Sequence, residues 1–185
     1  MEKKLFALIL TGMFITGTVA FAMTIGQEPP ESYIKNLKNC QKSSEKIEDS
    51  IVSEYTINGF LSDGRCEVIM SSYTNFADPE IYEGYKAFAK TMINTTKKEN
   101  QKIPEIPTQQ QMIAQAQKEK NVTVCKFTQE QIDALYEAYH KKDNKNTCTT
   151  TSDGKQSCSF STANMSSYDK LMMNYSGSTC STKLP

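Results

Sequence analysis

The chain has 185 residues, 21 basic and 21 acidic side chains, one histidine and no tryptophan. Its zero formal charge disfavours nucleic acid or an anionic membrane surface as the main partner, since either would select a basic face. The length is enough for one ordinary domain with its own core.

The N-terminus has the pattern of a secretory signal peptide. Lys3 and Lys4 precede an uncharged apolar run, and Ala20-Phe21-Ala22 fits a cleavage site. We therefore expect residues 1–22 to be removed by cleavage between Ala22 and Met23. After cleavage the chain should not be stably inserted in a membrane, and the expected location is the periplasm or the exterior of the cell.

The first elements of the mature chain are a short helix and a β-hairpin. Tyr33, Ile34 and Leu37 predict a helix that ends near Cys40, and the charged residues 41–50 are expected to be exposed. Residues 51–73 then predict a hairpin around Asp63-Gly64. A two-residue turn pairs Leu61 with Cys66, Gly59 with Val68 and Ile57 with Met70, and it gathers the apolar residues on one face better than a three-residue turn does.

Two helices follow the hairpin and form an expected insertion over residues 78–119. The first starts at Asp78-Pro79-Glu80, where a capping side chain precedes a proline and an acid. Its apolar stripe is wide. The second starts at Thr108, with Gln111 placed to complete a capping box, and it is mostly polar.

The rest of the chain predicts a strand, a helix, a second hairpin and a last helix. The strand covers residues 122–127, and Thr128 with Gln131 predicts a capping box at the start of the next helix. The hairpin covers residues 147–160. Tyr168, Leu171, Met172 and Tyr175 form the apolar stripe of the last helix.

These elements together predict an α+β fold. We expect a small antiparallel sheet, stapled by disulfides, with amphipathic helices packed on one face. The sheet would consist of hairpin 51–73, strand 122–127 and hairpin 147–160. Residues 23–185 would form a single exported domain.

Six cysteines lie after the signal peptide, at positions 40, 66, 125, 148, 158 and 180. An even number behind a signal peptide predicts three disulfides and an oxidising compartment.

One of these disulfides follows from turn geometry. If Ser152-Asp153-Gly154 is a three-residue turn with Gly154 in the left-handed region, Cys148 lies directly opposite Cys158. A two-residue turn would place the two cysteines on opposite faces. We predict a Cys148–Cys158 disulfide, and we assign the other four cysteines as Cys40–Cys66 and Cys125–Cys180.

Three short motifs carry a resemblance to known sequences. Leu37-x-x-Cys40, Gly64-x-Cys66-x-Val68 and Cys125-x-Phe127-Thr128 resemble those of small exported cysteine-containing proteins of host-associated bacteria. The resemblance implies an exported domain. That group has no assigned activity, so no catalytic residue is carried over from it.

Motifs for metal, redox or nucleotide chemistry are missing from the sequence. The two closest cysteines have nine residues between them, too many for the usual paired zinc ligands, and no C-x-x-C is present. The sequence has no P-loop, G-x-G-x-x-G or G-x-S-x-G. We therefore predict no metal site and no cofactor.

Catalytic groups are limited to carboxylates. A Ser-His-Asp or Cys-His site would need His140, which lies at the expected end of a helix, where a capping role is favoured. Two groups of acids, Glu130, Asp133 and Glu137 and Glu45, Glu48 and Asp49, have the spacing of solvated faces. We predict no catalytic residue from the sequence.

The favoured hypothesis is an exported, non-enzymatic binding module for an envelope or extracellular protein or glycan. One alternative is a carboxylate-dependent hydrolase of cell-wall glycans, which would need two carboxylates facing each other across a concave site. Another is an exported inhibitor or envelope-stress protein.

Overall fold

The computed structural model describes residues 28–96, 105–141, 143, 148–150, 156–158 and 165–183. The expected signal peptide and its cleavage site lie outside these residues. In the described part, no helix combines the length and the apolar character needed to cross a bilayer.

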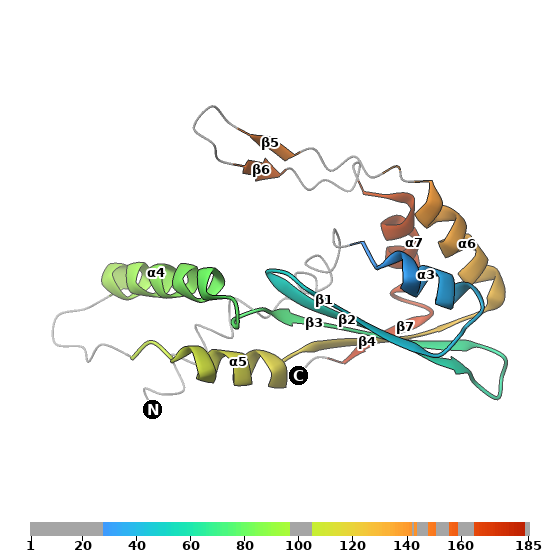
Figure 1. Cartoon of the computed structure of the whole chain (residues 1–185), viewed down its shortest axis with the longest axis horizontal. Coiled ribbons are helices and arrows are strands. Elements are labelled where there is room, and N and C mark those ends of the chain that lie inside the picture. The colour runs from blue at the N-terminus through green and yellow to red at the C-terminus, as the bar shows by residue number, and fades with distance from the viewer. Residues whose placement is uncertain are drawn as a thin grey trace.

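The fold is α+β, as the sequence predicts (Figure 1). The helices are α3 (Glu31–Lys38), α4 (Pro79–Thr96), α5 (Gln109–Lys118), α6 (Gln129–His140) and α7 (Ser167–Tyr175). The main sheet is antiparallel, in the order β1 (Ser43–Glu48), β2 (Ile51–Phe60), β3 (Cys66–Thr74), β4 (Asn121–Phe127) and β7 (Cys180–Lys183). A separate ladder joins β5 (Cys148–Thr150) to β6 (Gln156–Cys158).

The two strands predicted within residues 147–160 pair as β5 and β6, but the prediction that they join the main sheet is wrong. In the described residues, these strands pair only with each other. The outer positions of the sheet are taken by β1 and β7. Strand β1 lies in the segment expected to be merely exposed; its residues alternate between half-buried and exposed positions because one side of the strand faces α3.

The inner face of the sheet is covered by α3, α6 and α7, which lie together over the same end of the strands (Figure 1). The core contains Tyr33, Ile34 and Leu37 from α3, Ile132, Leu135 and Ala138 from α6, and Tyr168 and Met172 from α7. These side chains pack on Tyr55, Ile57, Val68 and Phe127 of the sheet. Helices α4 and α5 lie at the opposite end of the strands (Figure 1).

The register of the β2–β3 hairpin differs from the prediction. The Leu61 N–H donates to the Arg65 carbonyl (2.8 Å), so the turn has three residues, and Gly64 adopts a φ of 79°. This slip of one residue would turn the apolar side chains to the wrong face. A bulge between Ile57 and Gly59 restores the alternation, so that Ile57 lies opposite Val68 and Tyr55 opposite Met70.

Both predicted capping boxes are confirmed. Thr108 Oγ1 accepts from the Gln111 N–H, and the Thr108 N–H donates to Gln111 Oε1 (2.8 Å). Thr128 and Gln131 form the same pair at the start of α6. The local sequence therefore fixes where both helices begin.

Candidate binding surface

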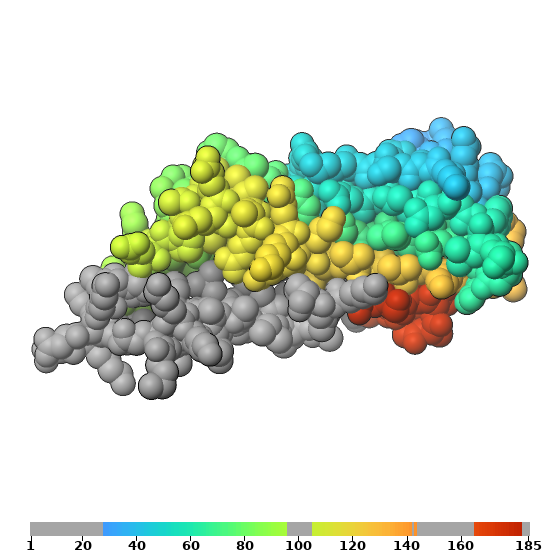
Figure 2. Space-filling view, turned by 90° about the horizontal axis from the view of Figure 1, so that it is seen from below, coloured from blue at the N-terminus to red at the C-terminus, as the bar shows by residue number. Residues whose placement is uncertain are grey.

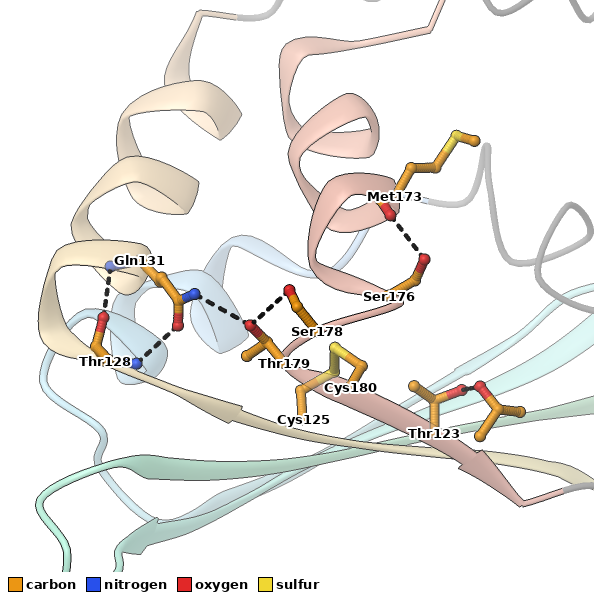
Figure 3. Close-up of a disulfide and its surroundings, with 10 residues drawn as sticks. Thr123, Cys125, Thr128, Gln131, Met173, Ser176, Ser178, Thr179 and Cys180 are labelled. Carbon is orange, nitrogen blue, oxygen red and sulfur yellow. Dashed lines mark hydrogen bonds between the residues drawn. A yellow bond between two sulfur atoms is a disulfide. The ribbon is translucent and has the colours of Figure 1, made fainter.

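Two disulfides link segments around the core, one between the end of a helix and a strand and one between two adjacent strands. Cys40, directly after α3, is bonded to Cys66 at the start of β3, with α-carbons 5.7 Å apart. Cys125 of β4 is bonded to Cys180, which lies opposite it at the start of β7. Both pairings are those assigned from the sequence. In Figure 3, Gln131 of the α6 capping box also donates to Thr179 Oγ1 (3.1 Å), just before Cys180.

The register of the third cysteine pair also agrees with the prediction. Cys148 lies directly opposite Cys158 in the β5–β6 ladder. The turn residues 151–155 lie outside the described residues, and the structure gives no side-chain geometry for these two cysteines. Their disulfide stays a prediction.

No described group of three or more His, Cys, Asp or Glu side chains is arranged to hold a metal ion. His140 lies at the end of α6, exposed, with its ring against those of Tyr136 and Tyr139. This position suits the capping role expected for it.

Among the described residues, the inner face of the sheet packs closely against the helices. Burial raises the pKa of Tyr33 well above its usual range, and burial raises the pKa of Tyr55 to about 12. The Tyr168 hydroxyl is also buried, which raises its pKa. Since Leu135 and Ile132 are completely buried beside them, the tyrosines here are core side chains.

The acids that the sequence singled out lie on surfaces. Glu130, Asp133 and Glu137 are exposed on α6. Glu45 accepts a hydrogen bond from the Ser32 hydroxyl (2.6 Å), and Glu48 pairs with Lys46. These interactions resemble surface pairing more than a catalytic pair across a cleft.

One acid outside those groups has a raised pKa. Burial is the main cause at Asp169, and the nearby Glu28 and Asp143 carboxylates raise its pKa further. Hydrogen bonds at the start of α7 account for the position of Asp169. Its carboxylate accepts a hydrogen bond from the hydroxyl of Ser166, the N-cap residue of α7 (2.8 Å). Asp143 accepts from the Ser167 N–H (2.8 Å) in the same turn. Both carboxylates thus satisfy donors at the start of the helix.

In Figure 2, no helix of the described residues lies over the middle of the opposite, outer face of the sheet. By strand alternation this face carries Ser44, Lys46, Glu54, Thr56, Asn58, Glu67, Ile69, Val122, Val124 and Lys126. Its central row runs from Thr56 through Ile69 to Val124 across three adjacent strands. The face mixes β-branched side chains with charges of both signs.

Helix α5 covers one end of this outer face. The prediction, in contrast, placed all helices on one side of the sheet. Ile113 and Gln117 of α5 and Val52 and Tyr73 of the sheet line a depression of about 100 Å³. Pockets for drug-sized ligands usually measure about 300–1,000 Å³. The depression therefore fits one side chain of a partner better than an enclosed small molecule.

The end of the sheet farthest from α4 and α5 is the tip of the β2–β3 hairpin (Figure 1), where Phe60 points to the same side of the sheet as the core residue Cys66. Phe60 next to the turn is 55% exposed, although the residue opposite it, Cys66, is completely buried. The exposure of Phe60 was not predicted from the sequence. The one feature of the sequence that could have indicated it is Gly59, which directly precedes Phe60 near the turn.

Comparison with protein-family models gives no match, and searches of curated proteins and of solved structures give no significant match. The functional interpretation therefore rests on the geometry of this chain.

Proposed function

We propose that the protein is an exported, non-enzymatic interaction module that binds another protein through the outer face of its sheet. The observation that carries this proposal is the contrast between the two faces. Helices α3, α6 and α7 pack on the inner face, whereas no helix of the described residues lies over the middle of the outer face. Flat faces of this kind bind macromolecules more readily than small substrates.

Export is part of the same proposal. We propose that residues 1–22 are cleaved and that the domain acts in the periplasm or outside the cell. The disulfides Cys40–Cys66 and Cys125–Cys180 support this, because such bonds persist in oxidising compartments. Mass spectrometry of the protein recovered from its native host tests it: a mature N-terminus at Met23 is expected, and an intact chain starting at Met1 contradicts it.

The binding function is tested by chemical crosslinking in the native host, with purification of the tagged protein. One protein recovered in stoichiometric amounts is expected, and its recovery should fall with Ile69→Lys on the outer face. Glu137→Lys, on the exposed side of α6, is the matched control and should leave recovery unchanged. Recovery of cell-wall fragments in place of a protein would contradict the proposal and favour a glycan ligand.

A further inference from the structure

We propose that the depression between α5 and the outer face of the sheet receives one uncharged aliphatic side chain, a leucine or an isoleucine, from the partner protein. This inference rests on the proposed function, since it names one contact within the same surface. Strand register places the depression on the outer face: Val52 of β2 lies opposite both Glu48 of β1 and Tyr73 of β3, and all three side chains line it.

Buried apolar side chains line the depression. Val52 and Phe76 are 2% and 5% exposed, and the half-buried Ile113 contributes from α5. The Gln109 side chain donates to the Phe76 carbonyl (2.9 Å), and the Asn75 side chain donates to a carbonyl of the β1–β2 turn (2.8 Å). These hydrogen bonds tie the loop after β3 to α5 and to that turn. The depression is therefore formed before a partner binds, which lowers the entropic cost of binding.

The volume of the depression indicates the size of the side chain that it can receive. It measures about 100 Å³. An apolar cavity that holds a benzene molecule measures about 150 Å³. The smaller space favours a branched aliphatic side chain over an aromatic ring.

Charges at the rim favour an uncharged insert. The charged lining residues are Lys46 and Glu48, and they pair with each other. Opposite Lys46, Glu54 accepts from the Lys120 ammonium (3.1 Å) and from the Ser71 hydroxyl (2.8 Å). Because each of these charges already has a partner of opposite sign, a charged insert would lose its hydration without gaining a free counter-ion. An aliphatic side chain carries no such cost.

The described residues of this chain do not themselves offer such an insert. Their exposed large apolar side chains are Phe60, Phe88 and Met173, which are two aromatic rings and one thioether. Every described leucine, isoleucine and valine is at least partly buried. The insert is therefore assigned to another protein rather than to a second copy of this chain.

The first test places a photocrosslinking amino acid in the full chain in its native host. Gln117→p-benzoylphenylalanine probes the depression, and Ile69→p-benzoylphenylalanine probes the centre of the outer face. Glu137→p-benzoylphenylalanine, at an exposed position of α6, is the control. An adduct with one other protein is expected from position 117 and not from position 137, and the crosslinked peptide should contain a leucine or an isoleucine.

The crosslinked protein is then purified and titrated with the chain recovered from the native host. Ile113→Phe fills the depression and should weaken binding by about tenfold or more, the loss expected when a buried aliphatic side chain loses its site. Lys118→Phe adds the same ring at an exposed position of α5 outside the lining, and it should change binding by less than about threefold. Thermal melts establish that the variants are folded. Gln117→Phe, at the exposed rim, repeats the test if Ile113→Phe lowers the melting temperature.

A substitution in the partner identifies the insert. Replacing the leucine or isoleucine of the crosslinked peptide by alanine should weaken binding about as much as Ile113→Phe does. The two changes together should weaken binding no further, because both remove the same contact. Additive losses would overturn the insertion.

The other outcomes separate the two proposals. Adducts from position 69 alone, or a loss below about threefold in the folded Ile113→Phe and Gln117→Phe variants, overturn the role of the depression and leave the interaction module standing. An aromatic or charged insert, or an adduct between two copies of this chain, overturns the stated occupant. A lack of adducts from both positions 69 and 117, or the same adduct from position 137, overturns both proposals.

Discussion

At one end of the sheet, three helices share a buried core and two disulfides hold the chain against the strands. At the other end, α4 and α5 rest on a few contacts: Tyr82 donates to the Pro107 carbonyl (2.9 Å), and Phe76 packs edge-on against Tyr85. Completely buried aliphatic side chains such as Ile132 and Leu135 occur at the first end, whereas Phe88 on α4 is half exposed. The first end should therefore determine the global free energy of unfolding, and the second should open locally.

Removing a disulfide tests the covalent part of this contrast. Replacing Cys125 and Cys180 by alanine should lower the free energy of unfolding by about 4 kcal/mol, and replacing Cys40 and Cys66 by about 3.5 kcal/mol. The difference follows from the sequence separations of 55 and 26 residues. Urea unfolding measures both values. A loss below about 1 kcal/mol in either variant would show that packing alone holds this end.

Backbone strain at Cys40 gives a second comparison of free energies of unfolding, between two variants that both lack the Cys40–Cys66 disulfide. Cys40 has a φ of 49°, in the left-handed region, where it ends α3; the Gln41 N–H donates to the Asn36 carbonyl (2.8 Å) as in a Schellman motif. Cys40→Gly with Cys66→Ala should therefore be more stable than Cys40→Ala with Cys66→Ala by about 1 kcal/mol. Equal stabilities would show that the backbone there relaxes once the bond is lost.

A core truncation compares packing at the two ends. Leu135→Ala should lower the free energy of unfolding by about 3 kcal/mol, because it leaves a cavity in the shared core. Met112→Ala, at a buried position of α5, should cost less than half of that in global unfolding and should mainly speed hydrogen exchange in α5. Similar global losses would mean that the two ends unfold as one unit.

The two identical capping boxes give a comparison with matched chemistry. Thr128→Ala should cost about 1 kcal/mol in global stability, since α6 belongs to the core. Thr108→Ala removes the same hydrogen bonds from α5, and its cost of about 1 kcal/mol should appear as faster exchange of α5 amides with an unchanged melting temperature. A matching drop in melting temperature for both variants would contradict the proposed difference between the ends.

Titration of Asp169 should produce a small pH dependence. Burial raises its folded pKa above the ordinary value of 3.8, so the folded state binds the proton more tightly than the unfolded state does. Its contribution to stability is present below pH 3.8 and is lost as the pH rises through the folded pKa. Asp169→Asn should therefore gain stability relative to the natural protein as the pH rises from about 4 to about 7.

Asp63→Asn is the control, for which the change in stability with pH should have the opposite sign. The folded pKa of Asp63 is lowered by Arg65, so its contribution is present at neutral pH and is lost as the pH falls through the folded pKa. The melting temperatures of both variants against pH give the two slopes. Slopes of the same sign would contradict the assignment of these two environments.

The sequence predicts where helices and strands lie along the chain better than it predicts which of them pair or pack together in the fold. Apolar periodicity and two Thr–Gln capping boxes locate α5 and α6, and a short run of β-branched residues locates β4. Strand β1 was missed because its sequence, SSEKIE, is mostly polar. The segment forms a strand because it pairs with β2, and this pairing cannot be predicted from the local sequence pattern.

The register of the hairpin shows the same limit. Asp63-Gly64 fits a two-residue turn, and the apolar alternation favours it, but the chain uses a three-residue turn and a bulge that together give nearly the same buried face. Two irregularities that compensate are invisible to a pattern of alternation. The identity of the face that α3, α6 and α7 cover was equally hidden, because it depends on where the helices pack.

The Cys40–Cys66 disulfide has a consequence for cleavage of the chain. Arg65 is the single arginine, and it lies between Gly64 of the turn and the bonded Cys66. A protease specific for arginine would cut the described chain there into two fragments that the disulfide keeps joined. The hairpin tip is thus a place where the backbone can be nicked without separating the two parts, and adding a reductant would reveal the cut.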